Sequence, residues 1–402
     1  MPALLDLAGT RFLETAWHEV TQTKKRLPSF YRVGLDGQSM QTFESRRDQG
    51  LAELGRRIRQ KQFRFSLLEP VFVPKQNGKE RLICVPIIAD RIVQRALLNF
   101  VSRGATWMDN GISYGFVRAR TVPQAVDQAK KLRQQKPWAI KTDITAFFDC
   151  IDRGLLWEML TRRVKHRSLH PLLEQAMNCE IAVGNNSLKD KLRKVGVRPG
   201  RGVRQGMALS PYFANVMLEP FDKACIKRGC AAVRYADDLL FFADSRAEAE
   251  RVLEFCTTEL RKLNLGIPEL ADESKTQIAA PAEPVAFLGT ELACTQGEGY
   301  ELRVASAQFD KMKEALYDLK SVADLRKRNL DVARFGNSLE ARVRAFEAAY
   351  EHCVNLPDVL EHLKACRNNV VEALMDSLGV QIKTLNDDAR WFLGLQPRPQ
   401  NA

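Results

Sequence analysis

Apolar side chains recur at helical spacing near both ends of the chain. Near the amino end, one stripe consists of Phe12, Leu13, Ala16, Trp17 and Val20. After residue 290, a second stripe consists of Phe309, Met312, Leu316 and Leu319. Apolar residues three and four positions apart predict amphipathic helices that pack one face on a core. We expect further helices at 339–353 and within 356–378, and we expect the aromatic group at 391–393 to dock on the protein body.

Between these helical regions the pattern changes to short apolar runs. Residues 231–234 and 239–243 are two such runs, and they flank the tetrapeptide Tyr-Ala-Asp-Asp at 235–238. Short runs around a turn predict a β-hairpin, with Asp237 and Asp238 at its tip. Ionised side chains are rarely placed in apolar surroundings unless they are paired or bound to a metal. The alternative is a purely structural Asp pair in a turn.

A second carboxylate segment lies upstream. Residues 139–143 predict a strand that ends at Asp143, and Asp152 is a suitable N-cap for the helix that follows. Alone, Asp143 is equally compatible with a turn. Together with the hairpin tip, it supplies three carboxylates that are able to converge, and such a cluster raises its own pKa values unless cations are bound. Two Mg²⁺ ions would make the cluster a clamp for in-line phosphoryl transfer.

Several sequence blocks, in series, resemble a bacterial reverse transcriptase of the group II intron-related lineage. In chain order they are Gly34-Leu35-Asp36-Gly37, residues 73–94, Ser113-Tyr114-Gly115-Phe116, the Asp143 segment, Arg204-Gln205-Gly206 with Ser210-Pro211 and Asn215, residues 235–238, Ser274-Lys275-Thr276 and Phe287-Leu288-Gly289. The resemblance implies an α/β (α+β) right-hand polymerase. We expect an N-terminal helical extension at 1–63, fingers and palm around an antiparallel sheet at 64–290, and an α-helical thumb with a C-terminal tail at 291–402.

The resemblance assigns the catalytic chemistry to the three carboxylates. Asp143, Asp237 and Asp238 would hold two Mg²⁺ ions, with the backbone carbonyl of Ile144 as a further ligand. One ion would activate the primer 3′-hydroxyl, and the other would neutralise the triphosphate and pyrophosphate. Lys275 is a candidate general acid for the leaving pyrophosphate. An ordinary exposed lysine is the alternative for Lys275.

Two basic residues flank a predicted hairpin turn in the fingers. Asn77-Gly78 is a favoured hairpin dipeptide, and it separates Lys75 from Arg81. The resemblance implies that both side chains lie over the active site. There Arg offers phosphate oxygens a planar fork and Lys offers a point charge. A solvated surface hairpin is the alternative, and Lys79 competes for the role of the second charge.

An aromatic residue follows Asp143 by five positions. This residue is Phe148, and in the family the residue at this position lies under the sugar of the incoming nucleotide. A bulky ring there crowds a 2′-hydroxyl and favours deoxynucleotides, whereas RNA-dependent RNA polymerases place a polar residue at this position. Phe148 therefore favours DNA synthesis. Phe147 and Phe148 are adjacent on a strand-like stretch, so we expect them to point to opposite sides, one of them into the core.

The resemblance implies that the loop before the helix at Ser210 lines the nucleotide and template site. The family uses Gln205 and Gly206 for this purpose, and Ser210 is expected to be the N-cap of the helix. Arg204 stands where relatives commonly have proline, and Met207 stands where they commonly have a small residue. These departures make Arg204 a candidate for binding a template phosphate or a noncoding RNA.

The composition of the chain limits the classes of partner that it is expected to bind. The formal net charge of +12 and the pI of about 9.3 favour a polyanionic partner, here an RNA template, a DNA product and dNTPs. The 9 cysteines form no Cys-x-x-Cys pair, so we expect reduced thiols, no zinc and a cytoplasmic location. No signal peptide and no apolar run long enough to cross a bilayer are evident, so no membrane partner is expected.

The biological setting follows from the resemblance alone. It favours a stand-alone, defence-associated reverse transcriptase that copies a dedicated noncoding RNA in antiphage defence. An intron- or retron-type reverse transcriptase, a non-catalytic RNA-binding maturase-like protein and a template-independent nucleotidyl transferase are the alternatives. Intact carboxylates at all three positions disfavour the maturase-like protein, because binding alone needs no metal cluster. The sequence predicts neither the primer nor the oligomeric state.

Overall fold

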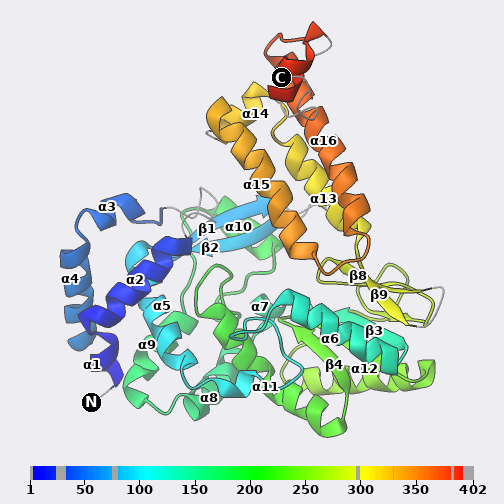
Figure 1. Ribbon diagram of the computed structural model, residues 1–402. Coiled ribbons are helices and arrows are strands. Elements are labelled where there is room, and N and C mark those ends of the chain that lie inside the picture. The colour runs from blue at the N-terminus through cyan, green and yellow to red at the C-terminus, as the bar shows by residue number, and fades with distance from the viewer. Residues whose placement is uncertain are drawn as a thin grey trace. The chain divides into compact units, whose positions relative to one another are not determined.

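The computed structural model describes residues 3–23, 33–74, 80–295, 299–328, 330–381 and 384–392 (Figure 1). Its α-helices are α1 Ala3–Leu7, α2 Thr10–Thr23, α3 Met40–Glu44, α4 Arg47–Arg59, α5 Ile88–Ser102, α6 Val122–Gln135, α7 Phe147–Cys150, α8 Arg153–Arg163, α9 His170–Met177, α10 Asn186–Lys194, α11 Ser210–Arg228, α12 Arg246–Arg261, α13 Ser306–Tyr317, α14 Val322–Lys327, α15 Val332–Tyr350, α16 Leu356–Ser377 and α17 Asp387–Phe392. Its strands are β1 Glu69–Pro74, β2 Glu80–Val85, β3 Trp138–Asp143, β4 Ala231–Tyr235, β5 Asp238–Ala243, β6 Gln277–Ala279, β7 Val285–Phe287, β8 Thr290–Cys294 and β9 Tyr300–Val304.

These elements confirm the predicted mixture of helices and antiparallel sheets. The chain divides into two compact units: one comprises Met1–Arg120, Lys141–Phe241 and Glu250–Gln277, and the other comprises Thr121–Ile140, Phe242–Ala249 and Ile278–Ala402. We call them unit 1 and unit 2. In the described ranges no helix is long and apolar enough to cross a membrane. The predicted turn at 75–79, which contains Lys75 and Lys79, lies outside the described residues. The predicted docking of 391–393 concerns side chains that also lie outside the description.

The helices at the amino end of unit 1 pack as the apolar stripe predicts. Helix α2 lies against α4 and α5, and its stripe residues Leu13, Ala16, Trp17 and Val20 are buried. The indole Nε1 of Trp17 donates a hydrogen bond to Glu44 at 2.8 Å. The stripe is therefore core packing, because a buried apolar face is what holds a surface helix on its neighbours.

The strands of the described residues form three small sheets. Strands β1 and β2 form an antiparallel hairpin whose register sets Val73 opposite Arg81. A four-stranded sheet has the order β4-β5-β3-β6, and β7, β8 and β9 form an antiparallel sheet in that order. In the four-stranded sheet, β4 and β5 are neighbours joined by Ala236 and Asp237, and β3 lies beside β5. The hairpin predicted around the Tyr-Ala-Asp-Asp tetrapeptide is thus confirmed.

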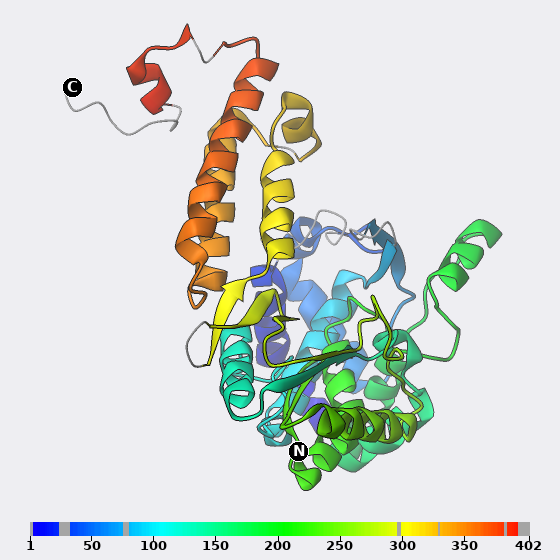
Figure 2. The same ribbon diagram turned by 90° about the vertical axis from the view of Figure 1, so that its right-hand side faces the viewer.

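Unit 2 contains a bundle of the helices α13, α15 and α16, which lie side by side in both views (Figures 1 and 2). Met312, Leu316 and Leu319 are buried, as the second apolar stripe predicts. The helix expected at 339–353 instead spans Val332–Tyr350, because Asp331 caps it by accepting a hydrogen bond from the Arg334 amide. The helix expected within 356–378 is α16.

Candidate active site

The turn between β4 and β5 is held in an unusual backbone conformation. Ala236 has a φ of 57°, in the left-handed region that costs a residue with a side chain some strain. The segment ending at Gly115 runs beside the turn: the Tyr114 amide donates to the Arg234 carbonyl at 2.8 Å. A Cβ on Gly115 would lie 2.3 Å from the Ala236 nitrogen. Glycine at 115 is therefore what lets this segment press against the Asp-Asp turn.

The end of β3 meets the same turn. The Ile144 amide donates to the Asp237 carbonyl at 3.0 Å, so the backbone after Asp143 is tied directly to the backbone of the turn. One carboxylate oxygen of Asp143, Oδ2, is paired with Lys275 Nζ. The other, Oδ1, is buried without a hydrogen-bond partner. The structure thus brings Asp143, Asp237 and Lys275 together.

The electrostatics of the cluster reflect like charges held close in partly buried surroundings. Burial, followed by the charges of Asp237 and Asp143, raises the pKa of Asp238 to about 6, while Lys141 and Lys275 oppose the rise. Burial and then Asp143 also raise the pKa of Asp237, against Lys275 and Arg81. The charge of Asp143 thus acts on the pKa values of both Asp237 and Asp238.

The donor set suits a divalent cation of the hard, oxygen-seeking kind. Three carboxylates and a buried, unpartnered Asp143 oxygen offer negative charge that nearby lysines only partly balance. In the described part of the chain, no three His, Cys, Asp or Glu side chains converge in metal-binding geometry, and the Lys275 ammonium neutralises Asp143. The hydrogen bond from Ile144 to Asp237 joins the backbones that carry the two carboxylate segments, and the chemistry of these donors is that of a hard cation site. Ile144 stays a predicted ligand: its amide is engaged with Asp237, which leaves the role of its carbonyl untested.

Phe148 lies where α7 begins, and its surroundings differ from those predicted. Residues 147–150 form a short helix and not a strand-like stretch, and the two phenylalanine rings lie 5.4 Å apart. Phe147 is the core residue of the pair, and Phe148 is half-buried. The Val203 amide donates to the Phe148 carbonyl at 2.8 Å, and a Cβ on Gly202 would lie 2.7 Å from that carbonyl. The loop from 200 to 206 is therefore seated on the backbone of α7.

The same loop is also joined to β2. The Cys84 amide donates to the Gln205 carbonyl at 2.7 Å, and a Cβ on Gly206 would lie 2.3 Å from the Cys84 carbonyl. Gly206 has a φ of 109°, so only glycine fits both the conformation and the close approach. Gln205 and Gly206 are thus brought beside the strand that carries Arg81. Arg81 in turn acts on the pKa of Asp237.

Two expectations for the loop are wrong. Arg204 does not face a nucleic acid: its side chain is buried, and its Nη2 pairs with Glu180 at 2.6 Å because an unpaired buried charge would be costly. Ser210 is not an N-cap. It is the first residue of α11, and its hydroxyl donates to the Arg204 carbonyl at 2.7 Å. Asp152 does cap α8, through the amides of Gly154 and Leu155, as predicted.

Two buried residues behind the turn were not predicted from the sequence. Arg234 was grouped with the apolar run before the tetrapeptide, and Asp222 received no role. The structure buries both and pairs them at 2.5 Å. The signal was present: a charged residue in an otherwise apolar strand needs a partner for the same reason that the two aspartates do.

Comparisons with known proteins identify a family and several similar proteins. Residues 73–292 match the family described as Reverse transcriptase (RNA-dependent DNA polymerase). Protein YkfC of Escherichia coli is 28% identical over 59% of this chain and 69% of its own length. Group II intron-encoded protein LtrA of Lactococcus lactis is 23% identical over 38% of this chain and 24% of its own length. A telomerase structure from Candida albicans, in complex with a fragment of telomeric RNA, covers 85% of this chain and 64% of its own, with 12% identity and a TM-score of 0.47.

Proposed function

The chain belongs to the reverse transcriptase (RNA-dependent DNA polymerase) family, and from this premise we propose that it copies RNA into DNA at Asp143, Asp237 and Asp238. The family match confirms the predicted enzyme class, and the reaction of this chain is our proposal. The observation that carries it is the hydrogen bond from Ile144 to the Asp237 carbonyl, at 3.0 Å. This bond joins the end of β3 to the Asp-Asp turn and makes one site of two carboxylate segments far apart in the sequence.

The proposed cofactor is a pair of Mg²⁺ ions held by the three carboxylates. When bound, the ions supply Lewis-acid activation of the primer hydroxyl and neutralisation of the phosphate charge. Side chains of the protein have the remaining proposed roles. Lys275, which pairs with Asp143, is the proposed proton donor to the leaving pyrophosphate, and Arg81 on β2 adds positive charge near Asp237. Phe148, only half-buried, offers a ring against which a deoxyribose is selected.

The proposed template is an RNA, and the net charge of +12 supports a polyanionic partner. We propose that this RNA is a dedicated noncoding RNA and that the role is antiphage defence, as the resemblance in the motifs favours. An intron-type reverse transcriptase is the second candidate, because LtrA is a group II intron-encoded protein. Both candidates use the same site and differ in which RNA is bound.

The experiment that tests this proposal begins with protein purified from its native host together with its bound RNA. Mg²⁺ and labelled dNTPs are added, with Asp237→Ala in parallel, and both the RNA and any DNA are sequenced. We expect DNA complementary to one bound RNA from the wild type and none from the variant, with RNA binding retained. An intron sequence as template would favour the intron-type enzyme. DNA without complementarity would point to a template-independent transferase, and equal loss of RNA binding and synthesis would contradict the assignment of the site.

A further inference from the structure

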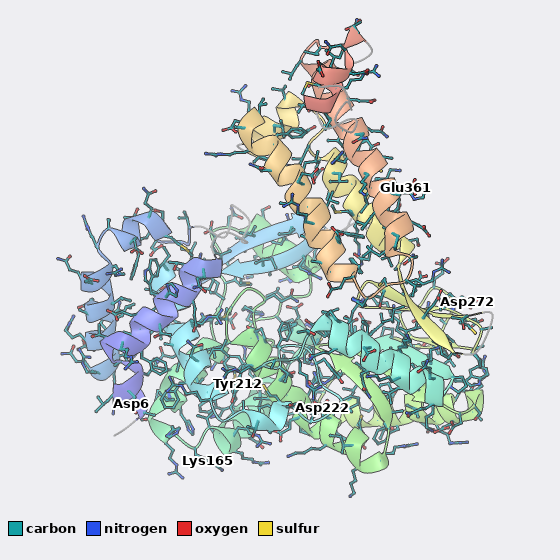
Figure 3. The ribbon with its side chains drawn as sticks, in the orientation of Figure 1. Asp6, Lys165, Tyr212, Asp222, Asp272 and Glu361 are labelled. Atoms are coloured by element: carbon teal, nitrogen blue, oxygen red, sulfur yellow. The ribbon has the colours of Figure 1, made fainter. Side chains whose placement is uncertain are left out.

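Behind the Asp-Asp turn lies a buried ion pair between β4 and α11. Arg234 and Asp222 are each only 2% exposed, and Figure 3 marks Asp222. Arg234 Nε donates to Asp222 Oδ1 at 2.7 Å, and its Nη2 donates to Oδ2 at 2.5 Å. A two-pronged contact of this kind holds a guanidinium in one orientation.

The remaining Arg234 donors reach the backbone and side chains around the turn. Nη1 donates to the Ala236 carbonyl and to Asn215 Oδ1, both at 3.1 Å, and Nη2 donates to Ser113 Oγ at 2.8 Å. With the two bonds to Asp222, every N–H of the guanidinium has an acceptor. Ala236 is the strained residue of the turn, so the guanidinium bonds the very peptide group whose conformation needs support.

The partners of Arg234 are themselves held in place. Asn215 Nδ2 donates to the Gly115 carbonyl at 3.0 Å, and Gly115 is the residue pressed against Ala236. Asn110 Nδ2 donates to Asp222 Oδ2 at 2.9 Å. The network therefore connects α11, the segment before Phe116 and the turn through directional bonds, which lose their effect when a single member is misplaced.

We propose that Arg234 is a positioning residue: through the Ala236 carbonyl, it sets where Asp237 and Asp238 lie relative to Asp143. This inference rests on the proposed polymerase site. A pair that merely joined α11 to β4 would need only the contact with Asp222. The bond to Ala236 acts on the residue immediately before the first carboxylate of the turn, and no apolar side chain can replace it.

Unit 2 offers a matched comparison. Arg133 on α6 is also fully buried, and its guanidinium donates to the carbonyls of Leu292, Ala280 and Glu283 while lying 4.4 Å from the centre of the Tyr300 ring. It thus makes three hydrogen bonds, against the five of Arg234, and none of the three reaches the catalytic turn. If the loss of any buried arginine impaired catalysis, variants of Arg133 and Arg234 should both lose activity. If Arg234 positions the turn, only its variants should lose activity.

The test uses the full-length protein and the variants Arg234→Lys, Arg234→Met with Asp222→Leu, and Arg133→Met. The double variant replaces the ion pair by apolar side chains, an exchange that commonly preserves folding. Three readouts are compared: kcat and KM for dNTP in primer extension, the Kd for Mn²⁺ by calorimetry, and amide exchange at residues 235–238. Thermal midpoints show which variants are folded.

We expect both Arg234 variants to lose about 10–100-fold in kcat and in Mn²⁺ affinity, the range seen when groups that orient metal ligands are removed. The KM for dNTP should stay within about twofold of wild type. Amide exchange at 235–238 should accelerate, and Arg133→Met should alter only the thermal midpoint. A folded double variant with wild-type kcat and Mn²⁺ affinity would overturn the inference, as would unchanged affinity and exchange in Arg234→Lys. If the wild type makes no DNA, the proposed function fails, while amide exchange in Arg234→Lys still decides the positioning role.

Discussion

The Asp-Asp turn and the helical bundle of unit 2 are stabilised by different kinds of contact. The turn is surrounded by buried polar groups, with Arg234 donating to Ala236 and Ile144 donating to Asp237. Helices α15 and α16 pack through apolar stripes, of which Leu339 and Leu363 are buried members. Polar contacts are directional and fail when geometry shifts, whereas apolar contacts scale with buried area and tolerate small shifts. A substitution at the turn should therefore lower mainly the rate of catalysis. A substitution of similar size in the bundle should lower mainly the free energy of unfolding.

Among substitutions that keep all three carboxylates, the largest effect on synthesis should follow removal of the lysine beside Asp143. In Lys275→Gln, we expect single-nucleotide addition to slow by about 100-fold, because the candidate proton donor is gone. Mn²⁺ binding without nucleotide should become tighter, because the ammonium no longer competes for Asp143 Oδ2. Rapid-quench kinetics and calorimetry measure the two. The control is Lys262→Gln, which removes another exposed lysine paired with a carboxylate, Glu259; equal slowing in both variants would contradict a specific role.

A smaller loss should follow a methyl group added beside the turn. Gly115→Ala places a carbon where the Ala236 nitrogen is 2.3 Å away, so the turn must shift. We expect synthesis to fall by about 30-fold, within the range for displaced metal ligands, while circular dichroism shows retained secondary structure. Gly104→Ala is the control, since a Cβ there has no neighbour within 4 Å. Wild-type rates in Gly115→Ala would show that the turn is as tolerant as the bundle.

The dependence of stability on pH should also separate the two regions. The pKa of Asp238 is raised to about 6, so between its ordinary value and about 6 the folded protein binds this proton more tightly than the unfolded chain does. Without divalent cations, the contribution of Asp238 to the free energy of unfolding should therefore fall as pH rises through this window, and level off above it. Asp90, whose pKa is raised by burial to about 7, contributes with the same sign. Urea titrations from pH 4.5 to 7.5 measure the slope. Asp238→Asn should reduce the slope, and an unchanged slope in that variant would contradict the burial of the carboxylate.

The smallest effect on chemistry should come from the bundle. Leu363 is fully buried on α16, and Leu363→Ala should lower the free energy of unfolding by about 2–5 kcal/mol through lost contacts and a cavity. Addition of one nucleotide below the unfolding temperature should stay within about twofold of wild type. Thermal unfolding and rapid-quench kinetics on the same preparation give both numbers. A loss of rate as large as that in Gly115→Ala would remove the distinction between the two regions.

The predictable parts of the fold and site were those governed by local pattern. The strand that ends at Asp143, the hairpin around Asp237, the cap at Asp152 and the buried stripes of α2 and α13 all follow from periodicity and turn chemistry. The start of α15 was misplaced because its cap, Asp331, lies before the apolar stripe begins.

The parts that sequence reasoning missed depend on partners far along the chain. Two buried arginines each depend on a distant carboxylate: Arg204 meets Glu180, and Arg234 meets Asp222. Neither pairing has a spacing that identifies it. A charged residue inside an apolar strand indicates that a partner exists, but this signal at Arg234 was not used, and it would not have identified Asp222.

The most direct test of the central claim is primer extension on a defined RNA template with a DNA primer, dNTPs and Mg²⁺, comparing wild type with Asp237→Asn. The substitution keeps the size of the side chain and removes the charge that a cation would bind. If Asp143, Asp237 and Asp238 form the polymerase site, the wild type extends the primer to the end of the template, and the variant binds the same RNA equally well without extending it. Equal extension by both proteins would contradict the account.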